Sequence, residues 1–245
     1  MRNRIRTSEL EAKQKALHEK MDRRSEELGF NHDDIAPIYD GVKDANGYLD
    51  SKLRILWVMK EPYHEIVDGK PAGGGWELYD FTLELPMFRT MAKIVYGIVN
   101  EKYYDEIPEP DEEMLKLLQT TAYINVSKMP GQTSSNSSDL RKKMKDWQDI
   151  LQEQLETYSP DIIILGNTYE HIMEGHLGDN PKTDWVGEAS EPGTTAVLKT
   201  KSSQVIIVDA FHPSPMRKCG RPDLSDEKYI NSIIKGVLTV ASHIQ

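Results

Sequence analysis

Three short runs of apolar residues, at 53–59, 161–166 and 205–211, limit what this chain can fold into. Each run is almost continuously apolar, as is typical of strands that are buried on both faces. Two segments with apolar residues at helical spacing, 85–99 and 138–157, lie between the first and second runs, and a third, 226–243, follows the last run. We therefore predict an α/β protein with three layers, α/β/α, around a central and mostly parallel sheet of about four or five strands.

The rest of the chain predicts shorter elements and an N-terminal helix. Residues 7–28 have a thin apolar stripe at helical spacing, and Gly29 is a plausible stop. A short helix is expected at 111–119, a short strand at 121–125, and a neighbouring pair of strands at 196–199 and 204–208. Turn-forming residues predict loops over 30–52, 129–138 and 178–195. With no internal repeat and no clear linker, we expect a helical arm at 1–30 and a single α/β domain at 31–245.

Composition narrows the class of protein. Hydrophobic content of 38% with 29% charged residues is that of an ordinary globular chain, and no apolar run reaches the length of a membrane helix. Cys219 is the sole cysteine, which excludes an intrachain disulfide and a zinc or iron–sulfur site built from cysteines. No phosphate-binding glycine motif and no metal-ligand spacing is present. We expect a cytoplasmic monomer with no metal and no cofactor.

Charge is unevenly distributed along the chain. The net charge of −10 argues against a nucleic-acid partner. However, residues 101–113 hold seven acids and one lysine, whereas residues 124–145 hold five cations and one acid. Residues 212–222 add Arg217, Lys218 and Arg221 with no acid. Basic charge therefore gathers near two polar loops, although solvated surface is an equally good interpretation.

These two loops, Lys60–His64 and His212–Pro215, each follow one of the apolar runs. Ligands of open α/β sheets bind beyond the carboxyl ends of the parallel strands. If both strands lie in one parallel sheet, Glu61 and His212 can face each other across one pocket. Glu61 can then activate a water, the alternative being an acid that starts a turn. His64 and His212 can donate hydrogen bonds to a developing anion, the alternative being a structural role.

Other residues near these loops are candidates for contacts to a base or a phosphate. Asn125 ends a strand, and its amide can read one donor and one acceptor of a base edge, although capping is commoner. Asn167 lies at a strand–helix junction, where it either helps to hold a phosphate or caps the helix. Three aromatic residues can stack on a base, although we favour the core for at least two of them: Trp76, Tyr79 and Phe81.

Taken together, four stretches resemble the uracil-DNA glycosylase superfamily over residues 53–240. Met59–His64 (Met-Lys-Glu-Pro-Tyr-His) resembles the family's Gly-Gln-Asp-Pro-Tyr-His word, with Lys60 and Glu61 where the family has Gln and Asp. His212–Met216 resembles its His-Pro-Ser-Pro-Leu word. Tyr123–Lys128 looks like the Asn-Val-x-Lys strand end of the iron–sulfur branch, and Pro160–Gly166 like the strand before the phosphate-side helix.

The resemblance implies a role for each matching residue. Glu61 would activate water, and His212 would stabilise negative charge on the departing base. Tyr63 would wall the pocket against a 5-methyl group, and Met216 would fill the space left by a flipped base. The implied base-binding residues are Tyr63, Asn125, Trp76 and His64, and the implied DNA-binding residues are Ser214, Met216, Arg217, Lys128 and Asn167. The iron–sulfur branch uses four cysteines, so this chain would carry no cluster.

The resemblance and the residues lead to three functional hypotheses. The first is a monofunctional DNA glycosylase that flips out uracil or a related deaminated base and hydrolyses its N-glycosidic bond. Its partner is damaged DNA, with no membrane involved. The second is a non-catalytic nucleic-acid or nucleobase-binding protein on the same fold, which Lys60 and the acidic surface favour. The third is a hydrolase of a different small glycoside or nucleoside.

Overall fold

The computed structural model describes residues 5–30, 36–61, 66–67, 70–71, 81–131, 137–173, 184–186, 194–199, 204–215 and 223–244. Its elements in chain order are α1 (Thr7–Glu27), β1 (Gly41–Val42), α2 (Ala45–Asp50), β2 (Ile55–Met59), β3 (Ile66–Val67), β4 (Lys70–Pro71), α3 (Pro86–Asn100), the 3₁₀ turn η1 (Tyr104–Glu106), α4 (Glu112–Gln119), β5 (Ala122–Asn125), α5 (Ser137–Asp146), α6 (Gln148–Tyr158), β6 (Ile162–Gly166), α7 (Tyr169–Met173), β7 (Asp184–Val186), β8 (Thr194–Lys199), β9 (Gln204–Ala210) and α8 (Asp226–Ile244). No helix within these ranges is both long and apolar enough to cross a membrane.

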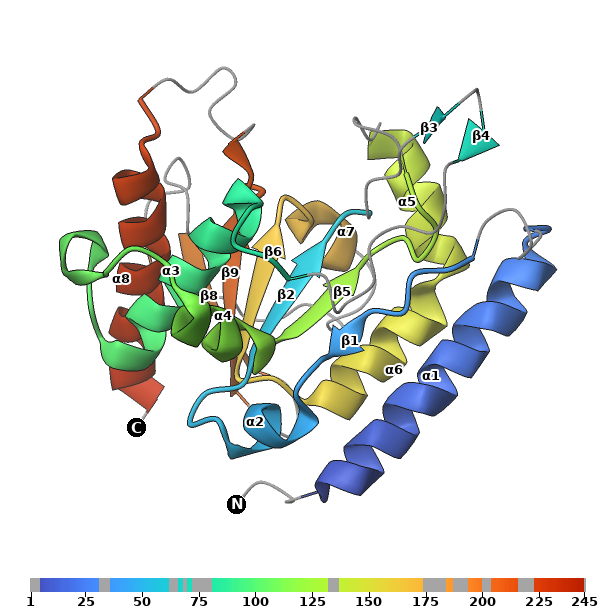
Figure 1. The fold of residues 1–245 in the computed structure, drawn as a ribbon, viewed down its shortest axis with the longest axis horizontal. Helices are drawn as coiled ribbons and strands as arrows, with labels where there is room; N and C mark the ends of the chain where they lie inside the picture. Colours follow the sequence, from blue (N-terminus) through green and yellow to red (C-terminus); the bar gives the residue numbers. More distant parts are fainter. Residues whose placement is uncertain are drawn as a thin grey trace.

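The main sheet has the strand order β1-β5-β2-β6-β9-β8-β7 (Figure 1). Its four central strands, β5, β2, β6 and β9, are parallel, whereas β1, β8 and β7 pair antiparallel at the two sides. The predicted α/β fold is confirmed, as is the pairing of the strands at 196–199 and 204–208. Because the four central strands are parallel, their carboxyl ends meet at one edge of the sheet.

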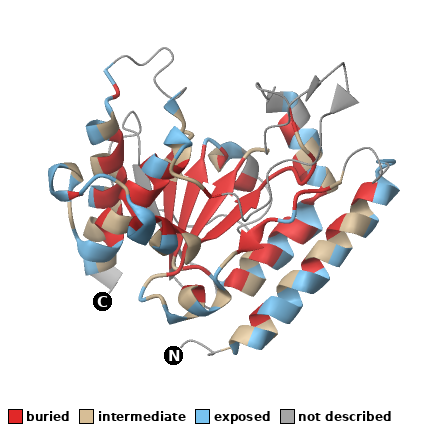
Figure 2. Ribbon diagram, viewed as in Figure 1, coloured by how far each residue is buried: buried red, intermediate tan, exposed pale blue. Residues whose placement is uncertain are grey.

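The central strands are buried because both of their faces are covered by helices, as Figure 2 shows. Side chains alternate between faces along a strand. Ile55 and Trp57 of β2 lie in one core cluster with apolar residues of α3, α4 and α8. Leu56 and Val58 lie in the other cluster, with residues of α1 and α6. The predicted three layers are therefore present, and the continuous apolar runs in the sequence reflect this two-sided burial.

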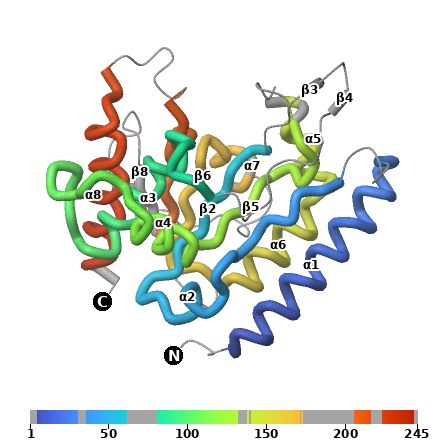
Figure 3. Tube along the Cα trace, in the orientation of Figure 1, coloured from blue at the N-terminus to red at the C-terminus, as the bar shows by residue number. Residues whose placement is uncertain are grey.

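The N-terminal helix α1 lies alongside α6 (Figure 3). Its thin apolar stripe, which includes the buried Leu10, Leu17 and Met21, belongs to the second core cluster. Gln14 of the same helix binds the backbone of the edge strand β1. Val42 N–H donates to Gln14 Oε1 at 2.7 Å, and Gln14 Nε2 donates to the Val42 carbonyl at 2.9 Å. The division of the chain into an arm and a domain at residue 30 stays a prediction.

The structure differs from the sequence-based expectation at residues 138–157, which form two helices rather than one. The chain leaves helical geometry at Trp147, with φ −112° and ψ 8°. The indole of Trp147 is 1% exposed and lies in the second core cluster. Two expected loops also contain short elements, because 30–52 includes β1 and α2 and 178–195 includes β7. Elements of two to six residues carry too little periodicity to be seen in a sequence.

Candidate functional site

Four of the expected site residues lie at the carboxyl edge of the four parallel strands. Glu61 follows β2, Asn125 ends β5, Asn167 follows β6 and His212 follows β9. The chain passes from β2 to β5 on one side and then crosses to β6 on the other side. This reversal of direction between β2 and β6 is where open α/β sheets place their ligands. The fold thus gathers these residues at a plausible binding edge.

The ends of β2 and β5 are joined by hydrogen bonds that continue beyond the strands. Val126 N–H donates to the Met59 carbonyl at 2.8 Å, and Ser127 N–H donates to the Lys60 carbonyl at 2.9 Å. These bonds fix the chain immediately before Glu61 against the chain immediately after Asn125. A rigid backbone at this point positions the two side chains better than an unsupported loop would.

The carboxylate of Glu61 forms an ion pair with Lys143 of α5. The Glu61 side chain is 5% exposed, and that of Lys143 is 37% exposed. The carboxylate also packs on Gly131, where a Cβ atom would collide with it. Glu61 therefore contacts the segment after β5 and helix α5. Neither its opposition to His212 nor its action on a water is tested by these contacts, and both stay predictions.

Asn125 is 1% exposed, and its backbone N–H donates to Asp40 Oδ2 at 2.6 Å. Its side-chain Oδ1 is buried and has no hydrogen-bond partner among the residues that the structure describes. Leaving a buried acceptor unsatisfied costs about 1–3 kcal/mol. A ligand that brings an N–H group to this oxygen would recover that cost. The geometry agrees with a base-reading role for Asn125 but does not test it.

His212 accepts a hydrogen bond from its own loop. Its Nδ1 lies 3.2 Å from the backbone N–H of Ser214, and only an unprotonated nitrogen can accept that hydrogen bond. A neutral ring then carries its proton on Nε2. Helix α8 anchors the start of this loop, because the Tyr229 hydroxyl donates to the Phe211 carbonyl at 2.5 Å. His212 therefore supplies an Nε2–H donor at the carboxyl edge.

The junction after β6 is tightly packed against both neighbouring strands. A Cβ atom at Gly166 would lie 2.6 Å from Met59 Sδ and 3.6 Å from Pro213 Cδ, so a larger residue would displace its neighbours. Asn167 has a left-handed backbone with φ 62°, and its N–H donates to the Ala210 carbonyl at 2.7 Å. Its side chain is exposed. Contact of Asn167 with DNA stays a prediction.

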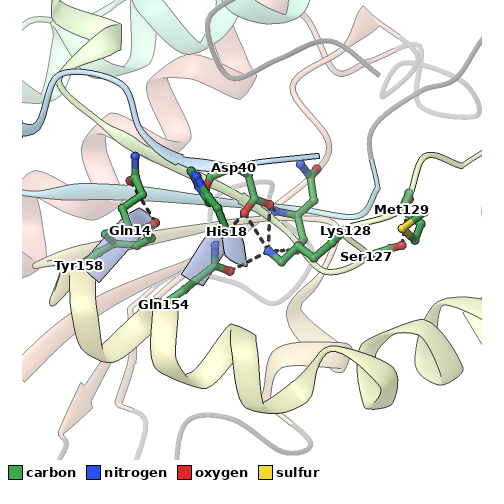
Figure 4. A network of polar contacts seen from close by, with 9 residues as sticks. Gln14, His18, Asp40, Ser127, Lys128, Met129, Gln154 and Tyr158 are labelled. Carbon is green, nitrogen blue, oxygen red and sulfur yellow. Dashed lines mark hydrogen bonds and ion pairs between the residues drawn. The ribbon is translucent and has the colours of Figure 1, made fainter. Parts of the chain in front are cut away.

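Lys128 is fully buried, so the sequence-based expectation that it contacts DNA has no support from its position and stays a prediction. Its ammonium donates to Asp40 Oδ1 at 3.0 Å and Oδ2 at 2.8 Å, to the Asn125 carbonyl at 2.7 Å and to Gln154 Oε1 at 2.7 Å. Figure 4 shows the contacts of Lys128 with Asp40 and Gln154. All three of its protons are used within the protein. Lys128 is a structural residue that braces the end of β5.

Asp40 and Gln154 complete this buried network, and no sequence pattern pointed to either residue. Gln154 Nε2 donates to Asp40 Oδ1 at 2.7 Å, so both carboxylate oxygens have partners from separate elements. Burial lowers the pKa of Lys128, and the Asp40 carboxylate opposes that change. Burial, followed by the charge of Asp40, raises the pKa of Tyr123. The network is thus one buried ion pair with its remaining hydrogen-bonding capacity satisfied.

Asp209 is a partly buried acid that the sequence analysis did not single out. It lies on β9 opposite Leu165, and burial raises its pKa to about 6, with a smaller contribution from the charge of Glu170. Burial and then the charge of Asp209 raise the pKa of Tyr169 as well. The signal was available, since an acid inside the apolar run 205–211 must be at least partly buried.

Comparisons with known proteins give little beyond this geometry. No family model matches the chain, and no curated protein matches it. Among solved structures, the chain is similar to one described as the crystal structure of mimivirus uracil-DNA glycosylase. The sequence identity is 10% and the TM-score 0.36, over 92% of this chain and 90% of that chain. A likeness of this degree carries no argument about activity.

The remaining expected site residues divide into two groups. Phe81 lies in the core, as we favoured for most of the aromatic residues, and meets Phe88 edge-on at 4.8 Å between ring centroids. The other expectations fall outside the described residues: Tyr63, His64, Trp76, Tyr79, Met216 and Arg217. Within the described ranges, no group of three or more His, Cys, Asp or Glu side chains is arranged to hold a metal ion.

Proposed function

We propose that the protein is a DNA glycosylase that hydrolyses the N-glycosidic bond of uracil or a related deaminated base. The observation that carries the proposal is the contact at His212, whose Nδ1 accepts from Ser214 N–H. Cleavage of the glycosidic bond leaves negative charge on the departing base. A fixed donor such as His212 Nε2–H stabilises this charge without any rearrangement during the reaction.

Asn125 and Glu61 have complementary roles in this proposal. The buried Oδ1 of Asn125 accepts from a ring N–H of the base, and the amide Nδ2 donates to a neighbouring carbonyl. Glu61 stabilises positive charge on the sugar and orients the attacking water, as carboxylates do in other glycoside hydrolyses. The target base must leave the DNA stack to reach residues this deeply placed. Neither step requires a metal.

The Glu61–Lys143 ion pair favours a second candidate function. A carboxylate that is already neutralised by a lysine is a poorer partner for water or for a sugar cation. The same carboxyl edge can instead bind a nucleobase or a nucleic acid without cleaving it. With this second function, the protein would bind oligonucleotides with an affinity that falls steeply as salt is raised, and it would release no base.

A base-release assay tests the proposal. The wild type and His212→Ala are incubated with uracil-containing single- and double-stranded oligonucleotides, and free uracil is measured. Loss of one donor to a developing anion lowers such rates by about 10²–10³-fold, which is the expected effect of His212→Ala. Lys116→Ala, which removes an exposed side chain of α4, is the control and should keep the wild-type rate. Absence of uracil release by the wild type from both substrates, with binding retained, would establish the second candidate instead.

A further inference from the structure

Helix α5 presents a row of cations near the proposed site. Leu140 and Met144 face the core and are buried, whereas three basic residues of the same helix are exposed: Arg141, Lys142 and Lys145. The helix stands beyond the end of β5, at the carboxyl edge of the sheet (Figure 1). A protein with a net charge of −10 thus places a compact basic surface at this edge.

Lys143 joins this basic surface to the proposed site. It belongs to the same helix, but its ammonium is paired with the carboxylate of Glu61. The pair is asymmetric, since the Lys143 side chain is 37% exposed and the Glu61 side chain is 5% exposed. Lys143 can therefore reach a ligand in solvent by a change of side-chain conformation, whereas Glu61 cannot follow it.

We propose that α5 binds the phosphate backbone of a nucleic acid and that a phosphate displaces Glu61 from Lys143. This inference rests on the proposed function, since it assigns α5 to the same substrate. Phosphate and carboxylate oxygens both accept charge-assisted hydrogen bonds from an ammonium, so the exchange replaces one strong contact by another. The three exposed cations of α5 add attraction for phosphate that Glu61 cannot match.

Arg141 of α5 has an acidic neighbour of its own. It lies 3.9 Å from Glu170 Oε2, and the two side chains are 49% and 75% exposed. An ion pair this exposed and this long contributes little to stability. A phosphate can therefore displace this contact at little cost, whereas displacement of Glu61 from Lys143 has a consequence for chemistry.

Displacement removes the Lys143 ammonium from the Glu61 carboxylate, in a place that water hardly reaches. A buried carboxylate in this state attracts developing positive charge more strongly than one that is already paired. The oxocarbenium-like sugar of a glycosylase reaction provides such a charge. Binding of the DNA backbone would thus prepare Glu61 for the reaction, and in the free protein Lys143 would keep the carboxylate neutralised.

Oligonucleotide binding at several salt concentrations tests the surface. The variant Lys142→Gln/Lys145→Gln removes two cations that would contact phosphate. It should bind more weakly, and the magnitude of the slope of log K against log salt should fall by about 1.4 for a single strand. Lys13→Gln/Lys15→Gln, on α1, removes the same charge from exposed positions and should leave the slope unchanged. An unchanged slope in the α5 variant would overturn the proposal, whatever the state of Lys143.

A double-mutant cycle tests the exchange at Lys143 without reference to activity. Glu61→Gln should tighten oligonucleotide binding about threefold or more, because the phosphate no longer competes for the ammonium. In the Lys143→Gln background the same change should have no effect on affinity. Equal effects of Glu61→Gln in both backgrounds would overturn the exchange. Lys143→Arg keeps the charge, so Glu61→Gln should still tighten oligonucleotide binding in that background. This comparison remains available if Lys143→Gln does not fold.

Base release gives the last comparison, and it separates this inference from the proposed function. Wild-type release should be at least about tenfold slower from a uracil trinucleotide than from a long oligonucleotide, both at saturation, whereas Lys143→Gln should show little difference. If the wild type releases base but Lys143→Gln keeps the wild-type length dependence, the inference fails alone. If the wild type releases none but the binding experiments succeed, the glycosylase proposal fails and α5 remains a nucleic-acid surface.

Discussion

Breaking the buried Asp40–Lys128 pair should destabilise the protein strongly. Asp40 is 1% exposed and Lys128 is fully buried, and the two share contacts at 2.8 and 3.0 Å. Asp40→Asn keeps the shape and the acceptor for Asn125 N–H but leaves the ammonium without a counter-charge. Removing one partner of such a pair costs about 3–5 kcal/mol in the free energy of unfolding. For a chain of this size, that loss lowers Tm by about 6–20 °C.

The double variant Asp40→Asn/Lys128→Met distinguishes charge from packing. It leaves no isolated charge in the core, so its cost should be smaller than the sum of the two single costs by about 2 kcal/mol or more. Lys116→Met is the matched control, because it breaks an exposed pair with Glu113 and should not change the midpoint.

Urea unfolding followed by circular dichroism measures these differences. The comparison is valid if the slope of the free energy of unfolding against urea stays constant among the variants. A loss below about 1 kcal/mol in Asp40→Asn would refute the reasoning, as would additive costs in the double variant. Either result would mean that water reaches the pair and that the ammonium is not held in a dry environment.

Two further predictions concern residues near the carboxyl edge. Asp209→Asn should stabilise the protein by about 1–2 kcal/mol at pH 8, after allowance for partial exposure, and by less as the pH is lowered towards 4. Between pH 3.8, the ordinary pKa of an Asp, and about pH 6, the folded state holds a proton on Asp209 that the unfolded state releases. The free energy of unfolding of the wild type therefore falls as the pH rises through that window. Thermal melts that show the opposite trend would contradict this prediction. Gly131→Ala should displace the Glu61 carboxylate and lower both the free energy of unfolding and the rate of base release. A crystal structure of the variant in which Glu61 has not moved would contradict this prediction.

Much of the fold was predictable because its signals are local. The apolar runs that form β2, β6 and β9 are buried on both faces, and a run of this kind needs only its own residues to be recognised. The break at Trp147 was not predictable, because both halves of the segment have helical periodicity. The indole at the break is buried in a core cluster with residues that are distant in the sequence, a contact that leaves no local pattern.

The candidate site was predictable in position but not in detail. The sequence places Glu61, Asn125 and His212 after strands, and parallel pairing then brings them to one edge. It says nothing about which partner each side chain has. Lys128 lies three residues after Asn125, yet it turns towards Asp40, which is 88 residues away along the chain. Contacts over such separations depend on the assembled fold and leave no local pattern.

The amide of Gln14 has a consequence for how this protein meets other molecules of its own kind. An edge strand normally offers open N–H and C=O groups on which a strand of another molecule can pair. On β1, Gln14 takes up both the N–H and the carbonyl of Val42 with one side chain, as a short neighbouring strand would. With both groups of Val42 bonded to the first helix, neither is open to a strand of another molecule at this position.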